Sequence, residues 1–475
     1  MTGQIPLVES SVIRITRILT VVGLLVSVSS AAPDSLDGVW RSEGYGYVFV
    51  VKGPTLRKFE ITATTCVPTF TARRRAADIS AREATFYTKD GDEFFVRTEG
   101  ASNRKLLHSE GAASDIRIDR LPKMPHVCDR PTPNTPGDNF EVFSRTWAEH
   151  YISFELKQID WNRIVAEARQ RVTSRTSPSD LFQILQSMIK TFGDAHTFIN
   201  GRSAKRMFHG IRPGTDRVAK NGLAALHGRE MHELLSGTDR VYLKAPVRKF
   251  CNDQIEYGHI DASIGYLRIW SFSGYSKERG FIAGEKALEA ALDEIFSDPK
   301  LGALVIDVRI NFGGEDPYGL EIASRLTNTQ YVAYTKYARA DAVDRATWTH
   351  GDESVIRPSS RPGFRGPIVE LTGPLTISAG ETFTQALMGR TPHVMRIGEN
   401  TQGVFSDVLV RKLPNGWFFG LPNEVYRTPE GTAFDGAGIP PDIAVPVFAD
   451  EDIIAGRDPG VAKAVEILRN ATEAS

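Results

Sequence analysis

The stretch LTISAGET, residues 375–382, places a serine where an apolar run ends and a helix-like run begins. The first N–H groups of a helix have no partners within the helix and lie at the positive end of its dipole. Ser378 at such a position suits either of two roles. It is a helix cap, or a nucleophile whose attacked carbonyl oxygen would be stabilised by the N–H of Ala379. The local sequence leaves both roles open.

Two further segments carry residue types that complete acyl-transfer chemistry. INFGGED directly follows the strand-like run ALVIDVR, and ligands bind outside the carboxyl ends of strands in open α/β sheets. Gly313 and Gly314 lack a Cβ, so this loop could offer a second oxyanion donor, or it could be only a tight turn. In GDAHT, His196 ends a helix-like run and is a candidate general base. His393 is its rival on chemistry alone, and a lone histidine is more often structural.

The elements that must position these residues form an alternating pattern after residue 258. IGYLRIWSF and ALVIDVRI are apolar, β-branched runs, and the amphipathic run GEKALEAALDEIFSD lies between them. Such a strand–helix–strand unit predicts parallel pairing with a right-handed crossover. PIVELTG and SAGETFTQALMGR repeat the order, and PGVAKAVEILRN predicts a final helix. We therefore expect an α/β core over residues 258–475 with a sheet that contains parallel strands.

Three segments precede this core. Residues 33–132 show short alternating apolar runs separated by turn residues, which predicts a small β-rich domain, either a sandwich or a barrel. The linker DRPTPNTPGDN follows it. Residues 138–200 have apolar residues at helical spacing, and SPSD, residues 177–180, is a helix-start signal. Residues 201–257 show no motif and are expected to connect the helical subdomain to the core.

The N-terminus indicates export, and export would allow two of the cysteines to form a disulfide. Two arginines precede an apolar run over residues 18–28, and small residues follow, as in a secretory signal peptide over residues 1–32. The mature protein would then be periplasmic or secreted, with no stable membrane span. In an exported chain, a disulfide is expected between Cys66 and Cys128, because both fall in the β-rich segment, and Cys251 is left over. An uncleaved N-terminal anchor is the alternative interpretation of the apolar run.

Composition excludes several classes of partner and cofactor. The chain has 475 residues, of which 41% are hydrophobic and 24% charged, with a formal net charge of −1. This balance provides no global field for binding nucleic acid or an anionic membrane. No CxxC or Cys/His cluster has metal-ligand spacing, so neither a metal nor a cofactor is predicted.

From about residue 140 to residue 447, the chain resembles the tail-specific, or C-terminal processing, peptidases and their tricorn-core relatives. The resemblance rests on an ordered series: WAEHYISFELKQIDW, FGDAHTF, IGYLRIWSF, ALVIDVRINFGG, TISAGETF, RIGENTQGVF and the final stretch ending in FDGAGIPPDI. It implies a serine peptidase that acts on peptides or proteins. The β-rich segment is not covered by it. Many relatives carry a PDZ insertion, but residues 201–257 look too short for one.

The resemblance implies one of two catalytic designs. The Ser–Lys design needs a lysine where this chain has Val404, so it is excluded unless another lysine, such as Lys412, substitutes. The Ser–His design implies that Ser378 attacks and His196 accepts its proton. A glutamate then supports the histidine through a serine hydroxyl. Asp435 matches the glutamate but is one methylene shorter, and Ala195 stands where the serine would be. A water or Thr197 could make this link, or Asp435 could be only a turn residue.

The sequence therefore predicts an exported serine endopeptidase that works through an acyl-enzyme. Its predicted catalytic residues are Ser378, His196 and Asp435, with oxyanion donors from Ala379, Gly313 and Gly314. The alternative is a catalytically weak or inactive relative that binds a peptide or another ligand, because two positions behind the histidine depart from the family pattern.

Overall fold

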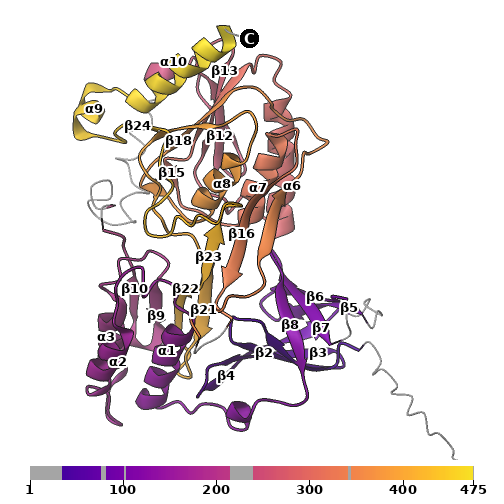
Figure 1. The fold of residues 1–475 in the computed structure, drawn as a ribbon, viewed down its shortest axis with the longest axis vertical. Helices are drawn as coiled ribbons and strands as arrows, with labels where there is room; N and C mark the ends of the chain where they lie inside the picture. The colour runs from indigo at the N-terminus through magenta and orange to yellow at the C-terminus, as the bar shows by residue number, and fades with distance from the viewer. Residues whose placement is uncertain are drawn as a thin grey trace, which may run out of the picture.

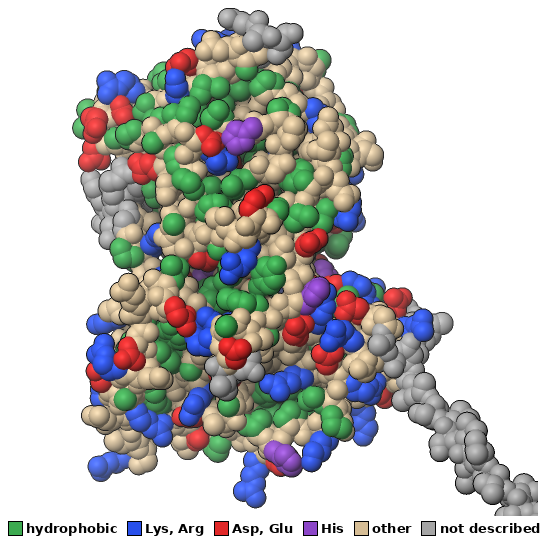
Figure 2. Space-filling model, in the orientation of Figure 1, with side chains coloured by type: hydrophobic (Ala, Val, Ile, Leu, Met, Phe, Trp, Pro, Cys, Tyr) green, Lys and Arg blue, Asp and Glu red, His purple; other side chains and the backbone are tan. Residues whose placement is uncertain are grey.

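The computed structural model describes residues 35–75, 82–100, 103–213, 215, 239–340 and 344–473 of the chain. The predicted signal segment lies outside these residues. The described part comprises a β-barrel and a helical unit beneath a larger α/β core (Figure 1). On the face drawn in Figure 2, acidic and basic side chains are interspersed. None of the described helices is both long enough and apolar enough to cross a membrane.

The N-terminal β-rich segment is a closed barrel of eight antiparallel strands, of which β1 pairs with both β2 and β8. Its interior is filled by apolar side chains that include Trp40, Phe49, Leu56 and Phe86. The strands are β1 (Gly38–Ser42), β2 (Tyr47–Lys52), β3 (Thr55–Ile61), β4 (Cys66–Arg74), β5 (Glu83–Thr88), β6 (Glu93–Thr98), β7 (Arg104–Ser109) and β8 (Ile116–Leu121). Closure leaves no unpaired edge at either end of the strand order, so the barrel needs no further strand to complete it.

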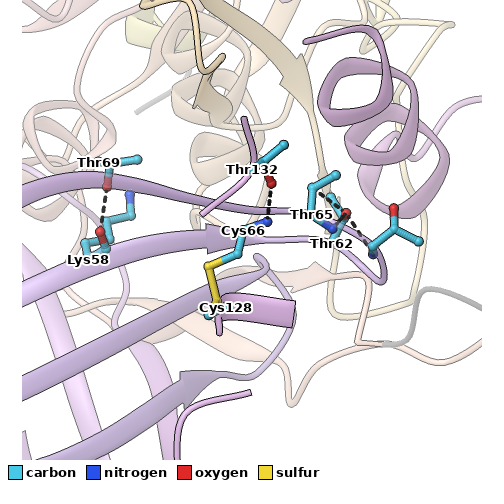
Figure 3. The surroundings of a disulfide bond; sticks show 8 residues. Lys58, Thr62, Thr65, Cys66, Thr69, Cys128 and Thr132 are labelled. Carbon is cyan, nitrogen blue, oxygen red and sulfur yellow. Dashed lines mark hydrogen bonds between the residues drawn. A yellow bond between two sulfur atoms is a disulfide. The ribbon is translucent and has the colours of Figure 1, made fainter. Parts of the chain in front are cut away.

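A disulfide joins the barrel to the segment that leaves it. Cys66 at the start of β4 is bonded to Cys128 in the short helix η1 (His126–Cys128), as the sequence predicted (Figure 3). The N–H of Cys66 also donates to the Thr132 hydroxyl at 2.8 Å. These links hold the linker against the barrel before the first long helix begins.

Three helices follow, each started by a side-chain cap. They are α1 (Pro136–His150), α2 (Trp161–Arg169) and α3 (Pro178–Ile189), and the capping residues Thr135, Asp160 and Ser177 each accept an N–H three residues ahead. Their apolar faces pack on strands from the far end of the chain, such as the one that carries Phe419 and Leu421. These strands belong to a sheet with the order β10-β9-β22-β21. Its bounds are β9 (Phe198–Gly201), β10 (Arg206–His209), β21 (Val408–Lys412) and β22 (Phe418–Pro422).

The core is a seven-stranded sheet in the order β11-β12-β13-β14-β18-β20-β24. The strands from β13 to β24 are parallel, as the sequence predicted, and helices cover both faces (Figure 1). One face packs on α6 (Phe281–Phe296), α7 (Asp316–Arg325) and α8 (Ala379–Met388), and the other on α10 (Pro459–Glu473). The strands are β11 (Arg248–Phe250), β12 (Ile255–His259), β13 (Ile264–Ile269), β14 (Ala303–Asp307), β18 (Ile368–Thr372), β20 (Met395–Gly398) and β24 (Ile443–Ala444).

Two small sheets and two short helices complete the described elements. A two-stranded sheet pairs β15 (Ile310–Asn311) with β19 (Leu375–Thr376). A three-stranded sheet has the order β17-β16-β23, with β16 (Tyr331–Ala338), β17 (Asp352–Ile356) and β23 (Glu424–Arg427). Since β23 follows β22 after one residue, it connects the sheet under the helices to the core. The remaining helices are η2 (Arg202–Ala204) and α9 (Asp450–Ala455).

The segment expected only to connect, residues 201–257, contributes structure of its own. Strands β11 and β12 extend the core sheet by an antiparallel hairpin at its edge, so the sheet begins upstream of residue 258. Their mixed polar sequence, RKF and IEYGH, gives no alternating signal of the kind that identifies a half-buried strand. Residues 214 and 216–238 of this segment lie outside the described residues.

Removing the disulfide should destabilise the barrel end of the molecule. The bond closes a loop with a sequence separation of 62 residues, and loop-closure entropy for that length corresponds to about 4 kcal/mol. We expect Cys66→Ser/Cys128→Ser to lower the free energy of unfolding by up to that amount in a denaturant titration. Cys251→Ala is the control for loss of a thiol alone. If a reducing agent lowers the stability of the wild type no more than that of the double variant, the pairing is wrong.

Candidate active site

Ser378 sits at a strained turn between β19 and the first residue of α8. Its backbone has φ 55° and ψ −119°, and a positive φ is uncommon for a residue with a side chain. Strained backbone of this kind is concentrated at functional sites, where the surrounding structure holds it in place. Ser378 is the N-cap of α8, so its side chain lies at the helix end that carries unpaired N–H groups. Of the two roles suggested by the sequence, the N-cap position is observed, and it leaves the nucleophile role open.

The small parallel sheet of β15 and β19 brings the loop with Gly313 and Gly314 into contact with Ser378. Ile310 pairs with Leu375 and Asn311 pairs with Thr376, which brings the ends of two core strands side by side. Gly313 has φ 75°, and a Cβ built on it would lie 2.7 Å from the Cβ of Ser378. Only glycine permits this approach, because such a separation is far below carbon–carbon contact distance. The two glycines and Ser378 thus form one loop cluster.

The N–H groups of this cluster are not equivalent. The Gly313 N–H donates to the Asn311 side-chain oxygen at 2.9 Å, so it is already paired within its own loop. Among the described residues, the N–H groups of Gly314 and Ala379 have no hydrogen-bond acceptor. Gly314 has φ 138°, and its backbone is close-packed on Phe272. These two N–H groups remain for an oxyanion.

A buried carboxylate ties the serine turn to the GENTQG loop. Glu381 accepts hydrogen bonds from the N–H of Ser378 at 3.3 Å, the Thr401 hydroxyl at 2.6 Å and the N–H of Val404 at 2.7 Å, and also from the N–H of Gly403. Burial raises the pKa of Glu381 to about 7, against the opposing effect of these donors. The S-x-x-E pattern of a capping box was a local signal for this residue. The sequence did not indicate that the same carboxylate also binds a loop twenty residues downstream.

His196 lies in the loop between α3 and β9, where Asp194 orients the backbone. The Asp194 carboxylate accepts the His196 N–H and the Tyr151 hydroxyl, each at 3.0 Å, and lies 3.4 Å from the Lys157 ammonium. His196 is 9% exposed, and its Nδ1 is buried without a hydrogen-bond partner among the described residues. Burial lowers the pKa of His196, while the charges of Asp194 and Asp407 oppose the shift. The imidazole is therefore neutral, and able to accept a proton, at neutral pH.

Carboxylates of both the serine turn and the histidine loop influence Asp435 and Arg212. Burial, followed by the charges of Glu381 and Asp194, raises the pKa of Asp435 to about 8. Those two carboxylates also act on Arg212, whose pKa is lowered by burial. Arg212 donates to the carbonyl of Gly436, the residue after Asp435, and its guanidinium lies against Gly403 of the loop that Glu381 binds. Among the described residues, no hydrogen bond joins the His196 imidazole to the Ser378 hydroxyl.

The predicted support of His196 by Asp435 is not made by a direct hydrogen bond in this structure. Oδ2 of Asp435 is buried without a partner, as is Nδ1 of His196, within the described residues. Thr197 does not bridge them, because its hydroxyl donates to the carbonyl of Asp194 at 2.8 Å. Two complementary groups in the same region are therefore left unsatisfied, which is rare for buried polar atoms.

The position that carries a lysine in the Ser–Lys design supplies no base in this chain. Val404 is buried beside Glu381 and has no titratable group. Lys412 lies in β21, and its N–H donates to Glu60 of the barrel. Lys336 is buried, but the charges of Asp407 and Glu424 outweigh the effect of burial and raise its pKa above the ordinary 10.5. A lysine that stays protonated cannot accept a proton from Ser378. His393 also lies elsewhere, where it contacts Asp442 at 3.0 Å.

Sequence reasoning missed several residues that the fold brings to this region. The role of Asp194 could have been predicted from the local sequence, because Asp194 lies two residues before His196. Lys336, Asp407 and Glu424 come from three separate strands or loops, and no local pattern indicates that they meet. Their ion pairs require the three-stranded sheet to be built first.

Substituting Gly313 should displace Ser378 and lower the free energy of unfolding. The added methyl group of Gly313→Ala would meet Ser378 and would also force a side chain into a left-handed conformation, so we expect a loss of about 2 to 4 kcal/mol in unfolding free energy. Ser378 should be displaced as well. Gly274→Ala is the matched control, because Gly274 has φ 68° and nothing within 4 Å of its Cβ position. Equal destabilisation of both variants would show that the close approach to Ser378 is unimportant.

Comparison with known proteins supports a peptidase relationship for the helical unit and the core. Residues 263–445 match the family model described as peptidase family S41, and residues 134–190 match that of the tricorn protease C1 domain. The chain is 27% identical over 186 residues to a carboxy-terminal-processing protease of Bartonella bacilliformis, which covers 39% of each protein. It is 26% identical over 246 residues to the chloroplastic carboxyl-terminal-processing peptidase 2 of Arabidopsis thaliana, which covers 50% of this chain and 44% of that protein. The aligned regions span less than half the length of these relatives.

A solved structure shows the same architecture. A crystal structure of a Parabacteroides merdae protein, assigned as a peptidase, superposes with a TM-score of 0.57 at 25% identity and covers 70% of this chain and 97% of that one. The barrel lies outside both family matches, which begin at residue 134. The α/β core with its parallel-containing sheet is confirmed, and together the matches support a relationship of this chain to the S41, or tail-specific, peptidases.

Proposed function

We propose that this protein is an exported serine peptidase that cleaves peptide bonds through an acyl-enzyme, with Ser378 as nucleophile and His196 as general base. The observation that carries the proposal is the backbone of Ser378. A strained, non-glycine residue at a helix N-terminus, packed against two glycines, is an arrangement that presents a hydroxyl beside free N–H groups. The family matches support the same chemistry.

The chemistry follows from these groups. As the Ser378 oxygen attacks the scissile carbonyl, its proton passes to the imidazole of His196. The carbonyl oxygen becomes an oxyanion, which the N–H groups of Ala379 and Gly314 would bind. Collapse of this intermediate breaks the C–N bond, and the imidazolium returns the proton to the leaving amine. A water, activated by the same imidazole, then hydrolyses the ester and releases Ser378.

A histidine base fits this chain better than a lysine base. Burial keeps His196 neutral at neutral pH. Lys336, by contrast, is kept charged by the neighbouring carboxylates of Asp407 and Glu424. The absence of a hydrogen bond between His196 and Ser378 in the described residues does not oppose this assignment, because such contacts are often long until substrate binds. Asp435 then has a place behind the histidine, reached through an intervening water where relatives have a serine.

Export and the substrate class complete the proposal. The disulfide between Cys66 and Cys128 suits an oxidising compartment, as the N-terminal sequence also suggests. Peptides and proteins are the substrates implied by the matching families. An extended peptide that adds to a sheet edge is the general mode by which such a site would bind them.

Covalent labelling by a fluorophosphonate probe tests the catalytic pair. The wild type should be labelled, because the probe reacts with an activated serine hydroxyl. Ser378→Ala should abolish labelling, and His196→Ala should slow it by about a thousandfold or more. His393→Ala is the matched control and should label as the wild type does. Folded wild-type protein that takes up no probe would support the alternative, an inactive relative that binds peptides.

Placing a serine hydroxyl at position 195 should strengthen the connection between Asp435 and His196. Ala195→Ser would let a serine bridge Asp435 and Nδ1 of His196, so we expect kcat to rise by up to about tenfold, the worth of one buried hydrogen bond. Asp435→Asn in the same background should remove the gain, which a double-mutant cycle measures. A gain that survives Asp435→Asn, or no gain in a folded variant, would mean that Asp435 is only a turn residue.

A further inference from the structure

A cavity of about 720 Å³ lies at the carboxyl ends of β20 and β24, where Gly398 and Ala444 line it. Its volume is in the range of small-ligand sites, and open α/β sheets bind ligands at this end of their strands. Most of the described residues that line the cavity are apolar, and five of them are prolines. The charged residues in this part of the wall are Arg212 and Glu399.

One part of the wall is joined to the turn that carries Ser378. Gln402 lines the cavity, and its N–H donates to the carbonyl of Thr376 at 3.0 Å. Its side-chain amide donates to the carbonyl of Pro374, which also lines the cavity, at 3.1 Å. Thr376 precedes Ser378 by two residues, and two residues span at most about 7 Å between Cα atoms. The cavity wall therefore contacts the strand that leads directly into the proposed nucleophile.

Another part of the wall packs on the loop that carries His196. Pro213 lines the cavity, and a Cβ built on Gly193 would lie 2.6 Å from Cδ of Pro213. The N–H of Gly210 donates to the carbonyl of Thr197 at 2.8 Å, which holds the same segment along the histidine loop. The cavity is thus bounded by residues that contact both loops of the proposed catalytic pair.

Arg212 brings a positive charge to this wall without a paired anion. Its guanidinium donates to the carbonyl of Gly436 and lies against Gly403, and it forms no ion pair with any described carboxylate. Burial lowers the pKa of Arg212, while the charges of Glu381 and Asp194 oppose the shift. A guanidinium stays protonated in proteins, and a partly buried charge is costly unless it is paired. A carboxylate that entered the cavity would therefore be stabilised by Arg212.

A second polar group of the wall calls for an N–H donor. Gln402 is 4% exposed, and its Oε1 has no hydrogen-bond partner among the described residues. Because the Pro374 carbonyl only accepts, the amide atom bonded to it is the nitrogen, and the atom left over is the oxygen. The carboxylate of Glu399, by contrast, already accepts the N–H of Val447 at 2.9 Å. A ligand that carries both a carboxylate and N–H groups, such as a peptide, matches this wall.

Exposed apolar side chains flank Arg212 and favour a peptide over a small inorganic anion. Ile211, the preceding residue, is 51% exposed. Leu156 is 57% exposed, and its Cδ2 would lie 3.1 Å from a Cβ built on Gly436, whose carbonyl Arg212 binds. Neighbouring residues of a bound peptide could cover these side chains, whereas a free anion would leave them in water.

We propose that this cavity is a substrate subsite in which Arg212 binds the carboxylate of an acidic peptide. The carboxylate comes from an Asp or Glu side chain or from the end of the peptide chain. The inference rests on the proposed peptidase function and adds a residue that determines its specificity. Arg212 lies outside both family matches, which cover residues 134–190 and 263–445.

Peptide binding to the full chain carrying Ser378→Ala tests the subsite without turnover. The probes are N-terminally fluorescein-labelled decapeptides of randomised sequence, with one position at a time fixed as Glu, Gln or Lys and with a free or amidated C-terminus. Fluorescence anisotropy should show that Glu at one position binds at least about tenfold more tightly than Gln, as expected for a charge-assisted hydrogen bond. If the free-acid peptides instead bind about tenfold more tightly than the amidated ones, with no preference for Glu, the carboxylate is that of the chain end.

Substituting Arg212 identifies the cation responsible. In the Ser378→Ala background, Arg212→Gln should abolish whichever preference is found, and Arg212→Glu should replace a preference for Glu by one for Lys at the same position. Arg206→Gln is the matched control, because it makes the same change of charge at an exposed arginine of β10 that does not line the cavity. It should retain the preference.

A preference that survives Arg212→Gln, or folded protein that prefers neither Glu nor a free C-terminus, would overturn the inference. Fluorophosphonate labelling of the wild type reports separately on Ser378. Charge-selective binding without labelling would leave the subsite standing and remove the peptidase, whereas labelling without charge selectivity would do the reverse. Failure of the subsite and failure of the proposed function are therefore distinguished.

Discussion

The buried carboxylate of Glu381 receives hydrogen bonds from Ser378, Thr401, Gly403 and Val404, and the geometry of the site depends on this convergence. A buried carboxylate must be satisfied by donors, because leaving it without partners costs several kcal/mol. Meeting that requirement brings the start of α8 and the GENTQG loop to one point. The strained backbone of Ser378 persists because the surrounding contacts leave it no relaxed alternative.

The electrostatics of the site follow from how each charged group is satisfied. Lys336 is buried between two carboxylates and stays protonated. His196 is buried with an unpartnered Nδ1 and stays neutral. Asp435 is buried among other carboxylates, which raises its pKa to about 8. These opposite shifts separate a proton acceptor from groups that hold their charge or their proton, and such a separation is typical of acid–base sites.

The barrel contacts both the core and the helical unit. Its interior is filled with side chains, so its contacts with the rest of the molecule are made by its outer surface and its hairpins. In the hairpin between β1 and β2, the Tyr45 hydroxyl donates to Glu424 Oε1 of β23 at 2.6 Å. The hairpin that carries Tyr45 also packs against the helical unit, where a Cβ on the neighbouring Gly46 would lie 2.8 Å from His150 Nε2 of α1. A cavity beside Asp407 has one wall from the barrel and one from the core.

Local sequence determined most of the elements of this protein. Periodicity in the core strands and helices, the caps at Ser177 and Ser378, and the cysteine pair all reflect interactions between residues close in the chain or shared by one segment. The order of motifs sufficed to propose Ser378 and His196. Tertiary structure alone decided that the Gly313 N–H is occupied and that Asp435 has no direct bond to His196. It also alone decided that Tyr45, Lys336, Asp407 and Glu424 meet, since contacts between distant segments form only when several sheets pack together.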